Sequence, residues 1–422
     1  MPSAYIPGST GTPESPGNRM AITLDTATPM NYDFDTVIDR RNTNSVKWDL
    51  ARERFGLEGV LPMWVADMDF RTPQPVADSL KRMVETGVFG YSTVPESYYR
   101  AVSAWLRKRH GWNTEHDWIV LTPGVMTGVH IAIKAFTSPG DRVIVHTPTY
   151  YPFFRAITNN GCEILDSPMR VEGGKYKIDF HDLERRIDRR TRLTILCSPH
   201  NPIGRVWERE ELMELGQLCL DRDITVVSDE IHSDIVYDGF KHIPFASISE
   251  AFASRSVVCT AASKTFNLPG LRTSGIIIPN GSLRETFTET LRTCGISSPN
   301  MLGVAATEAA YRFGEPWLDE LLHYLEGNLD LLEKYAAESI PGLRVTRPEG
   351  TFLAWLDFRG CGIDAERLGS FVREEARVGL QPGTLFGCRE EGFERMNIGC
   401  PRSLLEEGLK RIAEAVRRLR AR

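Results

Sequence analysis

Short apolar runs dominate the middle of the chain and constrain its fold more than any other feature. They are rich in Val, Ile, Leu and Cys and lie at residues 118–124, 142–148, 162–168, 193–199, 224–230 and 256–263. The first run leads into an apolar segment of helical length at 125–136. Near-continuous apolar strands separated by helices are typical of a parallel sheet with both faces covered. The sequence therefore predicts an α/β fold with a mostly parallel sheet.

The chain of 422 residues is expected to divide into successive parts. Residues 1–30 are rich in Pro, Gly, Ser and Thr and predict a disordered leader, while 31–75 form a segment associated with a small domain. Residues 76–315 carry the strand and helix alternation and predict a large domain. A long amphipathic helix then opens a smaller α+β domain at 316–422.

Composition excludes several classes of partner. The net charge of −6, with Lys and Arg scattered along the chain, argues against nucleic acid. No apolar run approaches the roughly 20 residues of a membrane span. The leader lacks the basic and apolar regions of a signal peptide. The eight cysteines form no C-x-x-C pair, so we expect free thiols, no metal site and a cytoplasmic protein.

Lys264 directly follows the last of these strands, in the segment "TAASKTFNLPGLRTS". Such a lysine either takes part in a structural ion pair or, with a lowered pKa, forms a Schiff base with an aldehyde. Asp229 ends another strand, where its carboxylate suits either a bare salt bridge or a protonated heterocyclic nitrogen such as that of pyridoxal phosphate (PLP). Because ligands bind outside the carboxyl ends of parallel strands, the two residues point to one crevice.

Further polar residues follow the other strands. Asn201 has an amide that can donate to a ring oxygen, although the Pro-rich turn around it also explains the segment. Gly124 opens the helix at 125–136, whose free N–H groups suit a phosphate. Tyr150 has a ring that can stack on a cofactor, and Ser263 and Arg272 can bind phosphate oxygens.

At this point the chain resembles the fold-type I PLP enzymes of the class I/II aminotransferase superfamily. Within it, the chain is most similar to the cystathionine β-lyase, or C–S lyase, branch of the MalY and PatB type. The resemblance runs from about residue 32 to the end, in "YDFDTVIDRRNTNSVKWD", "LPMWVADMDF", "GVFGYS", "CSPHNPIGRVW", "SDEIHSDIVY", "SKTFNLPGLRTS", "EGTFLAWLDF" and "RMNIGCPRS". It implies an aspartate aminotransferase-like fold, with a seven-stranded sheet in the large domain, and PLP as cofactor.

The resemblance also implies a role for each matching residue. Lys264 would carry PLP as a Schiff base, Asp229 would pair with its ring nitrogen, and Asn201 would donate to its phenolate oxygen. Cofactor-binding roles also fall on Tyr150 as the stacking ring, on the phosphate ligands Gly124, Val125, Ser263 and Arg272, and on His232, which stands where many aminotransferases have a tyrosine.

Two further residues complete the implied site. Arg395 matches the arginine that binds the substrate α-carboxylate. Tyr91 matches a tyrosine that reaches the active site of a neighbouring subunit, which implies a homodimer. Trp64, Tyr98 and Trp355 are aromatic candidates for the rest of the substrate pocket, and each is equally suited to the core.

The implied activity is β-elimination from L-cystathionine or another cysteine S-conjugate, giving a thiol, pyruvate and ammonia. Three alternatives stay open: an aminotransferase of class I/II, a C–S lyase acting on a cysteine conjugate in secondary metabolism, and a non-enzymatic regulator that binds PLP. "NSVKWD", "ADMDF" and "SDEIH" favour the lyase branch by resemblance.

Overall fold

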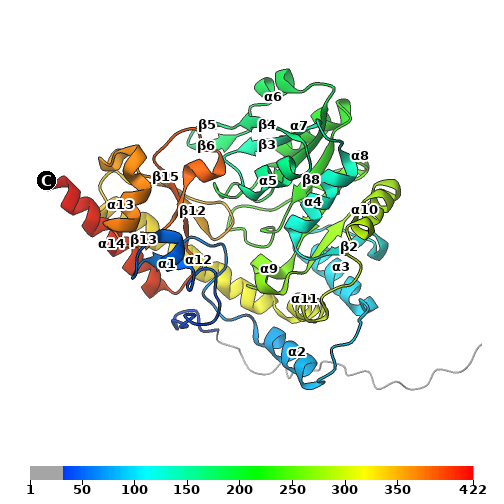
Figure 1. The fold of residues 1–422 in the computed structure, drawn as a ribbon, viewed down its shortest axis with the longest axis horizontal. Helices are drawn as coiled ribbons and strands as arrows, with labels where there is room; N and C mark the ends of the chain where they lie inside the picture. Colours follow the sequence, from blue (N-terminus) through cyan, green and yellow to red (C-terminus); the bar gives the residue numbers. More distant parts are fainter. Residues whose placement is uncertain (1–31, 422) are drawn as a thin grey trace, which may run out of the picture. The chain divides into compact units, whose positions relative to one another are not determined.

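The computed structural model describes residues 32–421, and the predicted leader at 1–30 lies outside the described residues. The helices and strands of the described residues lie in one compact unit that begins at Phe34. Two sheets organise this unit, a large one built from the middle of the chain and a small one built from its C-terminal part (Figure 1).

The large sheet has seven strands in the order β2-β10-β9-β8-β7-β3-β4. Their bounds are β2 Ile119–Thr122, β3 Arg142–Thr147, β4 Glu163–Pro168, β7 Thr191–Cys197, β8 Thr225–Asp229, β9 Ser256–Thr260 and β10 Ser274–Ile277. Neighbouring strands run parallel except β10, which is antiparallel to both β2 and β9. The predicted α/β fold with a mostly parallel sheet is therefore confirmed, and the reversed strand β10 was not predicted.

Alternate residues of the large sheet pack against helices on its two faces. Val143 and Val145 of β3 face a core that includes α4 (Val125–Phe136), α5 (Pro152–Asn159) and α10 (Gly281–Thr293). Ile144, between them, faces the opposite core with α6 (Phe180–Arg186), α7 (Arg209–Asp221) and α8 (Glu250–Ala253). This two-sided burial is the reason that the strands read as continuous apolar runs.

Helices α2 (Gln74–Glu85), α3 (Glu96–His110) and α11 (Met301–Phe313) form a further group that packs together at the β2 end of the sheet (Figure 1). The segment between α2 and α3 contains neither helix nor strand. The described residues contain no helix long and apolar enough to cross a membrane.

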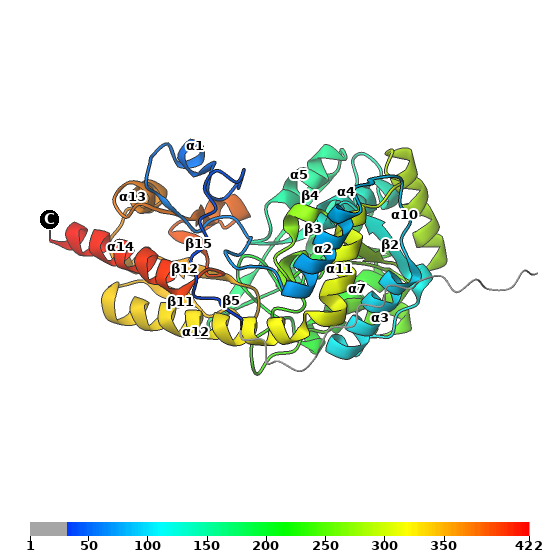
Figure 2. The ribbon, with the colours of Figure 1, turned by 90° about the horizontal axis from the view of Figure 1, so that it is seen from below.

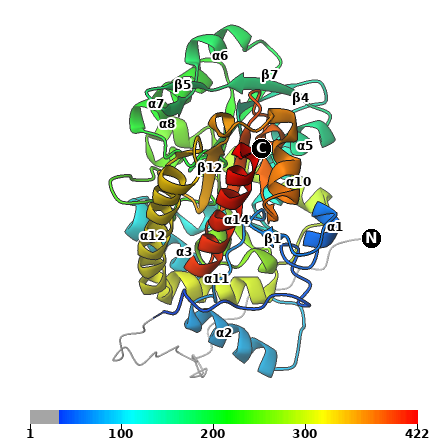
Figure 3. The same cartoon turned by 90° about the vertical axis from the view of Figure 1, so that its left-hand side faces the viewer.

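The small sheet has the strand order β11-β12-β15-β14 and is antiparallel. Its strands are β11 Arg344–Thr346, β12 Leu353–Asp357, β14 Gln381–Pro382 and β15 Phe393–Asn397. Helices α12 (Glu315–Ser339) and α14 (Arg402–Arg420) lie side by side next to it (Figures 2 and 3). The N-terminal segment joins this part of the chain, because β1 (Leu61–Pro62) pairs with β13 (Val378–Gly379).

Candidate active site

The carboxyl ends of the central strands enclose a cavity of about 210 Å³. Parallel pairing aligns Cys197, Asp229 and Cys259 across β7, β8 and β9, so the loops that follow these strands emerge side by side. Nine of the predicted site residues line the cavity: Gly124, Val125, Tyr150, Asn201, Asp229, His232, Ser263, Lys264 and Arg272. The structure therefore brings together residues that lie up to 148 positions apart in the sequence, from 124 to 272.

Lys264 lies on α9 (Ala262–Thr265), a single turn that follows β9. Its Nζ donates a hydrogen bond to the carbonyl oxygen of Ala66, which also lines the cavity. Burial lowers the pKa of Lys264 to about 8, with the nearby positive charge of Arg395 acting in the same direction. A substantial fraction of this amine is therefore neutral near physiological pH and able to act as a nucleophile or base.

Asp229 is the last residue of β8 and is almost completely buried. Its carboxylate accepts a hydrogen bond from the backbone N–H of Ile231 at 3.2 Å, and it forms no salt bridge with any described residue. Burial raises the pKa of Asp229 to about 7. A carboxyl group in this condition is available to a cationic ligand in the cavity.

One end of the cavity has the features of an anion site. Gly124 caps the N-terminus of the twelve-residue helix α4 with φ = 91°, a left-handed conformation that favours glycine. Val125 and Met126, at the start of this helix, line the cavity, and no side chain caps the N-terminus of the helix. Arg272 contributes an exposed guanidinium for which no salt-bridge partner occurs among the described residues. Helix N-termini and guanidinium groups together suit a phosphate.

Arg395, on β15 of the small sheet, reaches the same site and is 2% exposed. Its Nη1 donates to Asn201 Oδ1 at 2.9 Å, and its Nη2 donates to the carbonyl of Trp64 at 2.8 Å and to Gln381 Oε1. Its Nε is buried without a hydrogen-bond partner. Burial lowers the pKa of Arg395 to about 10, which leaves the group cationic at neutral pH. Because Asn201 accepts through Oδ1, its amide nitrogen remains available to donate.

The rings of Tyr150 and His232 also line the cavity. Tyr150 lies three residues after β3 and contacts the ring of Phe153 edge-on at 5.4 Å. His232 is 2% exposed, its ring lies edge-on to Phe352 at 5.7 Å, and its Nδ1 has no hydrogen-bond partner. Burial, together with the charges of Lys264 and Arg395, lowers the pKa of His232 well below its usual value, so the ring is neutral.

Some of the predicted residues lie elsewhere. Tyr91 is outside the cavity, in the segment between α2 and α3, and is fully exposed. Tyr98 and Trp355 are buried in the core, and Trp64 contributes its backbone carbonyl to Arg395, so none of the three aromatic candidates lines the cavity.

Sequence reasoning missed the contribution of residues 66–70 to the site. Ala66 accepts from Lys264 through its carbonyl, and the Asn267 side chain bonds the backbone of Met68 and Phe70. The partners lie 197 to 199 positions apart, so no local pattern could reveal them. A local sign that this segment belongs to the site is the stretch "ADMDF", in which two acidic residues lie among apolar ones.

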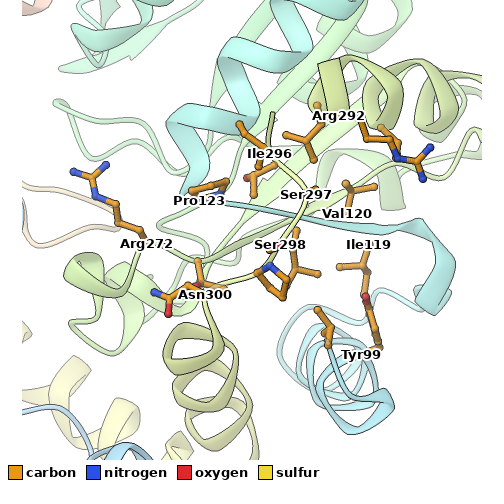
Figure 4. Close-up of a pocket in the computed structure, with 17 residues that line it drawn as sticks. Tyr99, Ile119, Val120, Pro123, Arg272, Arg292, Ile296, Ser297, Ser298 and Asn300 are labelled. Carbon is orange, nitrogen blue, oxygen red and sulfur yellow. The ribbon is translucent and has the colours of Figure 1, made fainter. Parts of the chain in front are cut away.

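A second cavity of about 550 Å³ adjoins the first and shares Pro123, Arg272 and Thr273 with it. Figure 4 shows its wall, in which Tyr99 and Ile119 lie on one side and the Arg272 side chain points away from them. Arg272 therefore stands at the boundary between the two cavities.

Comparison with known proteins agrees with this arrangement. The family model described as aminotransferase class I and II matches residues 60–412. The chain is 46% identical to cystathionine beta-lyase PatB of Bacillus subtilis, over 91% of this chain and 99% of PatB. It is 34% identical to protein MalY of Escherichia coli, over 92% of this chain and all of MalY.

Among solved structures, cystalysin from Treponema denticola superposes with a TM-score of 0.89 at 38% identity, covering 92% of this chain and all of cystalysin. That structure contains a pyridoxal 5'-phosphate cofactor. The resemblance stated from the sequence is confirmed: the chain belongs to the aminotransferase class I and II family, in the branch that includes PatB and MalY.

Proposed function

We propose that this protein is a PLP-dependent C–S lyase that cleaves L-cystathionine or another cysteine S-conjugate by β-elimination. The observation that carries the proposal is that one cavity is lined both by Lys264, an amine with a lowered pKa, and by Asp229, a buried carboxyl group that forms no salt bridge with a described residue. The names of the relatives support the same reaction, since PatB is a cystathionine beta-lyase.

The cavity residues fit PLP. A buried carboxyl group without a cationic partner suits the ring nitrogen, and the Asn201 amide suits the ring oxygen. The N-terminus of α4, Ser263 and Arg272 suit the phosphate, while Tyr150 offers a ring face. His232 contributes a further polar atom, since its Nδ1 is buried without a partner. When bound, PLP supplies an aldehyde that condenses with amines and a ring that withdraws electrons from Cα.

The side chains of the protein then have separate tasks. Arg395 binds the substrate α-carboxylate in the bidentate geometry of a guanidinium, and its position beside Asn201 fixes the orientation of the substrate. Lys264, with its pKa near 8, removes the proton from Cα. Electrons from that C–H bond form the Cα=Cβ bond while the Cβ–S bond breaks, and the thiolate takes up a proton as it leaves. The remaining three-carbon fragment is hydrolysed to pyruvate and ammonia.

An aminotransferase is the second candidate, favoured by the description of the family model. The same residues would serve it, because the reactions diverge only after Cα has lost its proton. A lyase for a secondary-metabolite cysteine conjugate would differ only in the groups beyond sulfur.

Incubation of the PLP-loaded protein with L-cystathionine separates these possibilities. We expect thiol and pyruvate in equal amounts over many turnovers. A keto acid retaining the substrate carbon skeleton, with stoichiometric pyridoxamine phosphate, would instead identify an aminotransferase. Turnover of other S-conjugates with cystathionine inert would narrow the substrate to a different conjugate.

We also propose that the protein is a homodimer in which Tyr91 reaches the neighbouring active site. Val88, Phe89 and Tyr91 form an exposed apolar stretch between α2 and α3, with exposed fractions of 70%, 61% and 105%. Apolar side chains that gather on an exposed segment are typical of an interface. The segment, "GVFGYS" at 87–92, is one of those that carry the resemblance to the family, and a tyrosine that reaches the neighbouring subunit would explain the complete exposure of Tyr91 in a single chain.

A cytoplasmic location fits the same proposal. All eight cysteines are free, and six of them are buried. Free thiols persist in a reducing compartment.

A further inference from the structure

A buried carboxylate accepts a hydrogen bond from the residue that follows Lys264. Thr265, which is fully buried, donates from Oγ1 to Asp234 Oδ2 at 2.8 Å. Asp234 itself is 5% exposed and lies in the loop after β8. The two residues are 31 positions apart, so the bond links the loops that follow β8 and β9.

The other oxygen of Asp234 is held by α3. Trp105 Nε1 donates to Asp234 Oδ1 at 3.0 Å, and His110 Nε2 donates to the same oxygen at 2.8 Å. Although burial opposes ionisation, the hydrogen bonds from His110, Thr265 and Trp105 keep the pKa of Asp234 below its usual value. The carboxylate is therefore charged, accepts hydrogen bonds through both of its oxygens and is fixed against a long helix, which makes it a rigid anchor.

Lys264 needs such an anchor because its own helix is short. Helix α9 has four residues and no side-chain N-cap, so its internal hydrogen bonds cannot fix its orientation. Among the described residues, its side chains make two hydrogen bonds, Thr265 to Asp234 and Lys264 to Ala66. Since the second is lost when Lys264 turns toward a ligand, the first is the attachment that persists.

A second buried carboxylate, that of Glu230, lies next to Asp229 in the sequence. Glu230, 3% exposed, accepts from Ser228 Oγ at 2.8 Å, from the backbone N–H of Phe245 at 2.9 Å and from His242 Nε2 at 2.9 Å. The rings of His242 and His110 meet edge-on at 5.2 Å. Glu230 and Asp234, two of the three acidic residues of "SDEIHSD", thus belong to one buried network, whose ends lie next to Asp229 and Lys264.

We propose that Asp234 is a positioning residue for Lys264, acting through Thr265. This inference rests on the proposed function, since it assigns Lys264 the covalent and proton-transfer tasks given above. Asp234 fixes the backbone of α9 relative to β8, so that the Lys264 amine is held at one distance from the group that Asp229 binds. It contacts neither substrate nor cofactor.

The test compares Thr265→Val, which removes the hydroxyl at nearly constant shape, with Thr265→Ser, which keeps it, and with Asp234→Asn. Thr191→Val is the matched control, because Thr191 is also buried and its Oγ1 bonds Asp188 at 3.2 Å, but it begins β7 at the end of the strand remote from the cavity. The readouts are the dissociation constant of PLP, the pH midpoint of the absorption band of lysine-bound PLP, kcat and KM, and the thermal unfolding of the apoprotein.

We expect Thr265→Val to shift the pH midpoint, to weaken PLP binding about tenfold and to lower kcat about tenfold at unchanged KM, because small displacements of a reacting group are costly. Thr265→Ser should match the wild type, and Thr191→Val should change only the unfolding temperature. If the Asp234→Asn protein does not fold, the Thr265→Val protein by itself tests the positioning role. A Thr265→Val protein that differs from the wild type only as Thr191→Val does would overturn the positioning role. Absence of a lysine-bound PLP band in the wild type would instead overturn the proposed function.

Discussion

The buried carboxyl of Asp229 should cost the apoprotein stability, and replacing it with asparagine should recover that cost. Its pKa rises from 3.8 to about 7 on folding, so the folded state binds a proton more tightly than the unfolded state. The stability linked to this group is therefore full below about pH 4 and is lost as the pH rises toward 7. At 1.36 kcal/mol per pKa unit, three units correspond to about 4 kcal/mol at most.

Asp229→Asn keeps the shape of the side chain and removes its titration. The free energy of unfolding of the apoprotein should therefore exceed that of the wild type by a margin that grows by about 3 kcal/mol between pH 5 and pH 8. Denaturant titrations of both apoproteins at one fixed protein concentration measure it, with the exposed Asp221→Asn as a control. PLP binding by the variant should weaken. A margin that is constant or shrinks with pH would refute the assignment of Asp229 as a desolvated, unpaired acid.

The remaining predictions address other parts of the site. Lys264→Ala should lose the absorption band of bound PLP and reduce kcat by a factor of about 10³ or more, as measured by spectra and thiol release. Arg395→Lys should raise KM about tenfold or more without abolishing the band, because an ammonium cannot bind a carboxylate in bidentate geometry. Mixed Tyr91→Ala and Lys264→Ala subunits should recover about a quarter of wild-type activity if Tyr91 acts across a symmetric dimer, and none if it acts within its own chain. Gly204→Ala should destabilise the protein by about 2 kcal/mol or more in denaturant titration, because φ is 70° and a Cβ would lie 2.3 Å from that of Pro348.

The strand ends were the most predictable part of the site. Continuous apolar runs identified β3, β4, β7, β8 and β9, and parallel pairing then required that residues following them share one edge of the sheet. This rule predicted that Asn201, Asp229 and Lys264 lie at one edge of the sheet, while their roles came from the resemblance. The reversed direction of β10 does not, since a four-residue apolar strand carries no sign of its direction.

Contacts between distant segments were not predictable in the same way. The motif "NSVKWD" was assigned by resemblance, and its structural reason lies in Asp69, which accepts from Lys47 Nζ at 2.6 Å, Trp48 Nε1 at 2.8 Å and Arg40 Nη1 at 2.7 Å. This buried group fixes the segment whose Ala66 carbonyl meets Lys264. In this chain "NSVKWD" supplies Lys47 and Trp48 as hydrogen-bond donors to Asp69 of "ADMDF", a contact that spacing along the chain cannot show.

Identification of the lysine that carries PLP is the most direct test of the site. The protein is loaded with PLP, reduced with borohydride and digested, and the modified peptide is located by mass spectrometry. We predict a single modified peptide in the wild type, the one that contains Lys264. The corresponding peptide of the Lys264→Ala variant should carry no modification. Modification of another lysine in the wild type, or none at all, would contradict the proposal that the cavity at the ends of β7, β8 and β9 is the cofactor site.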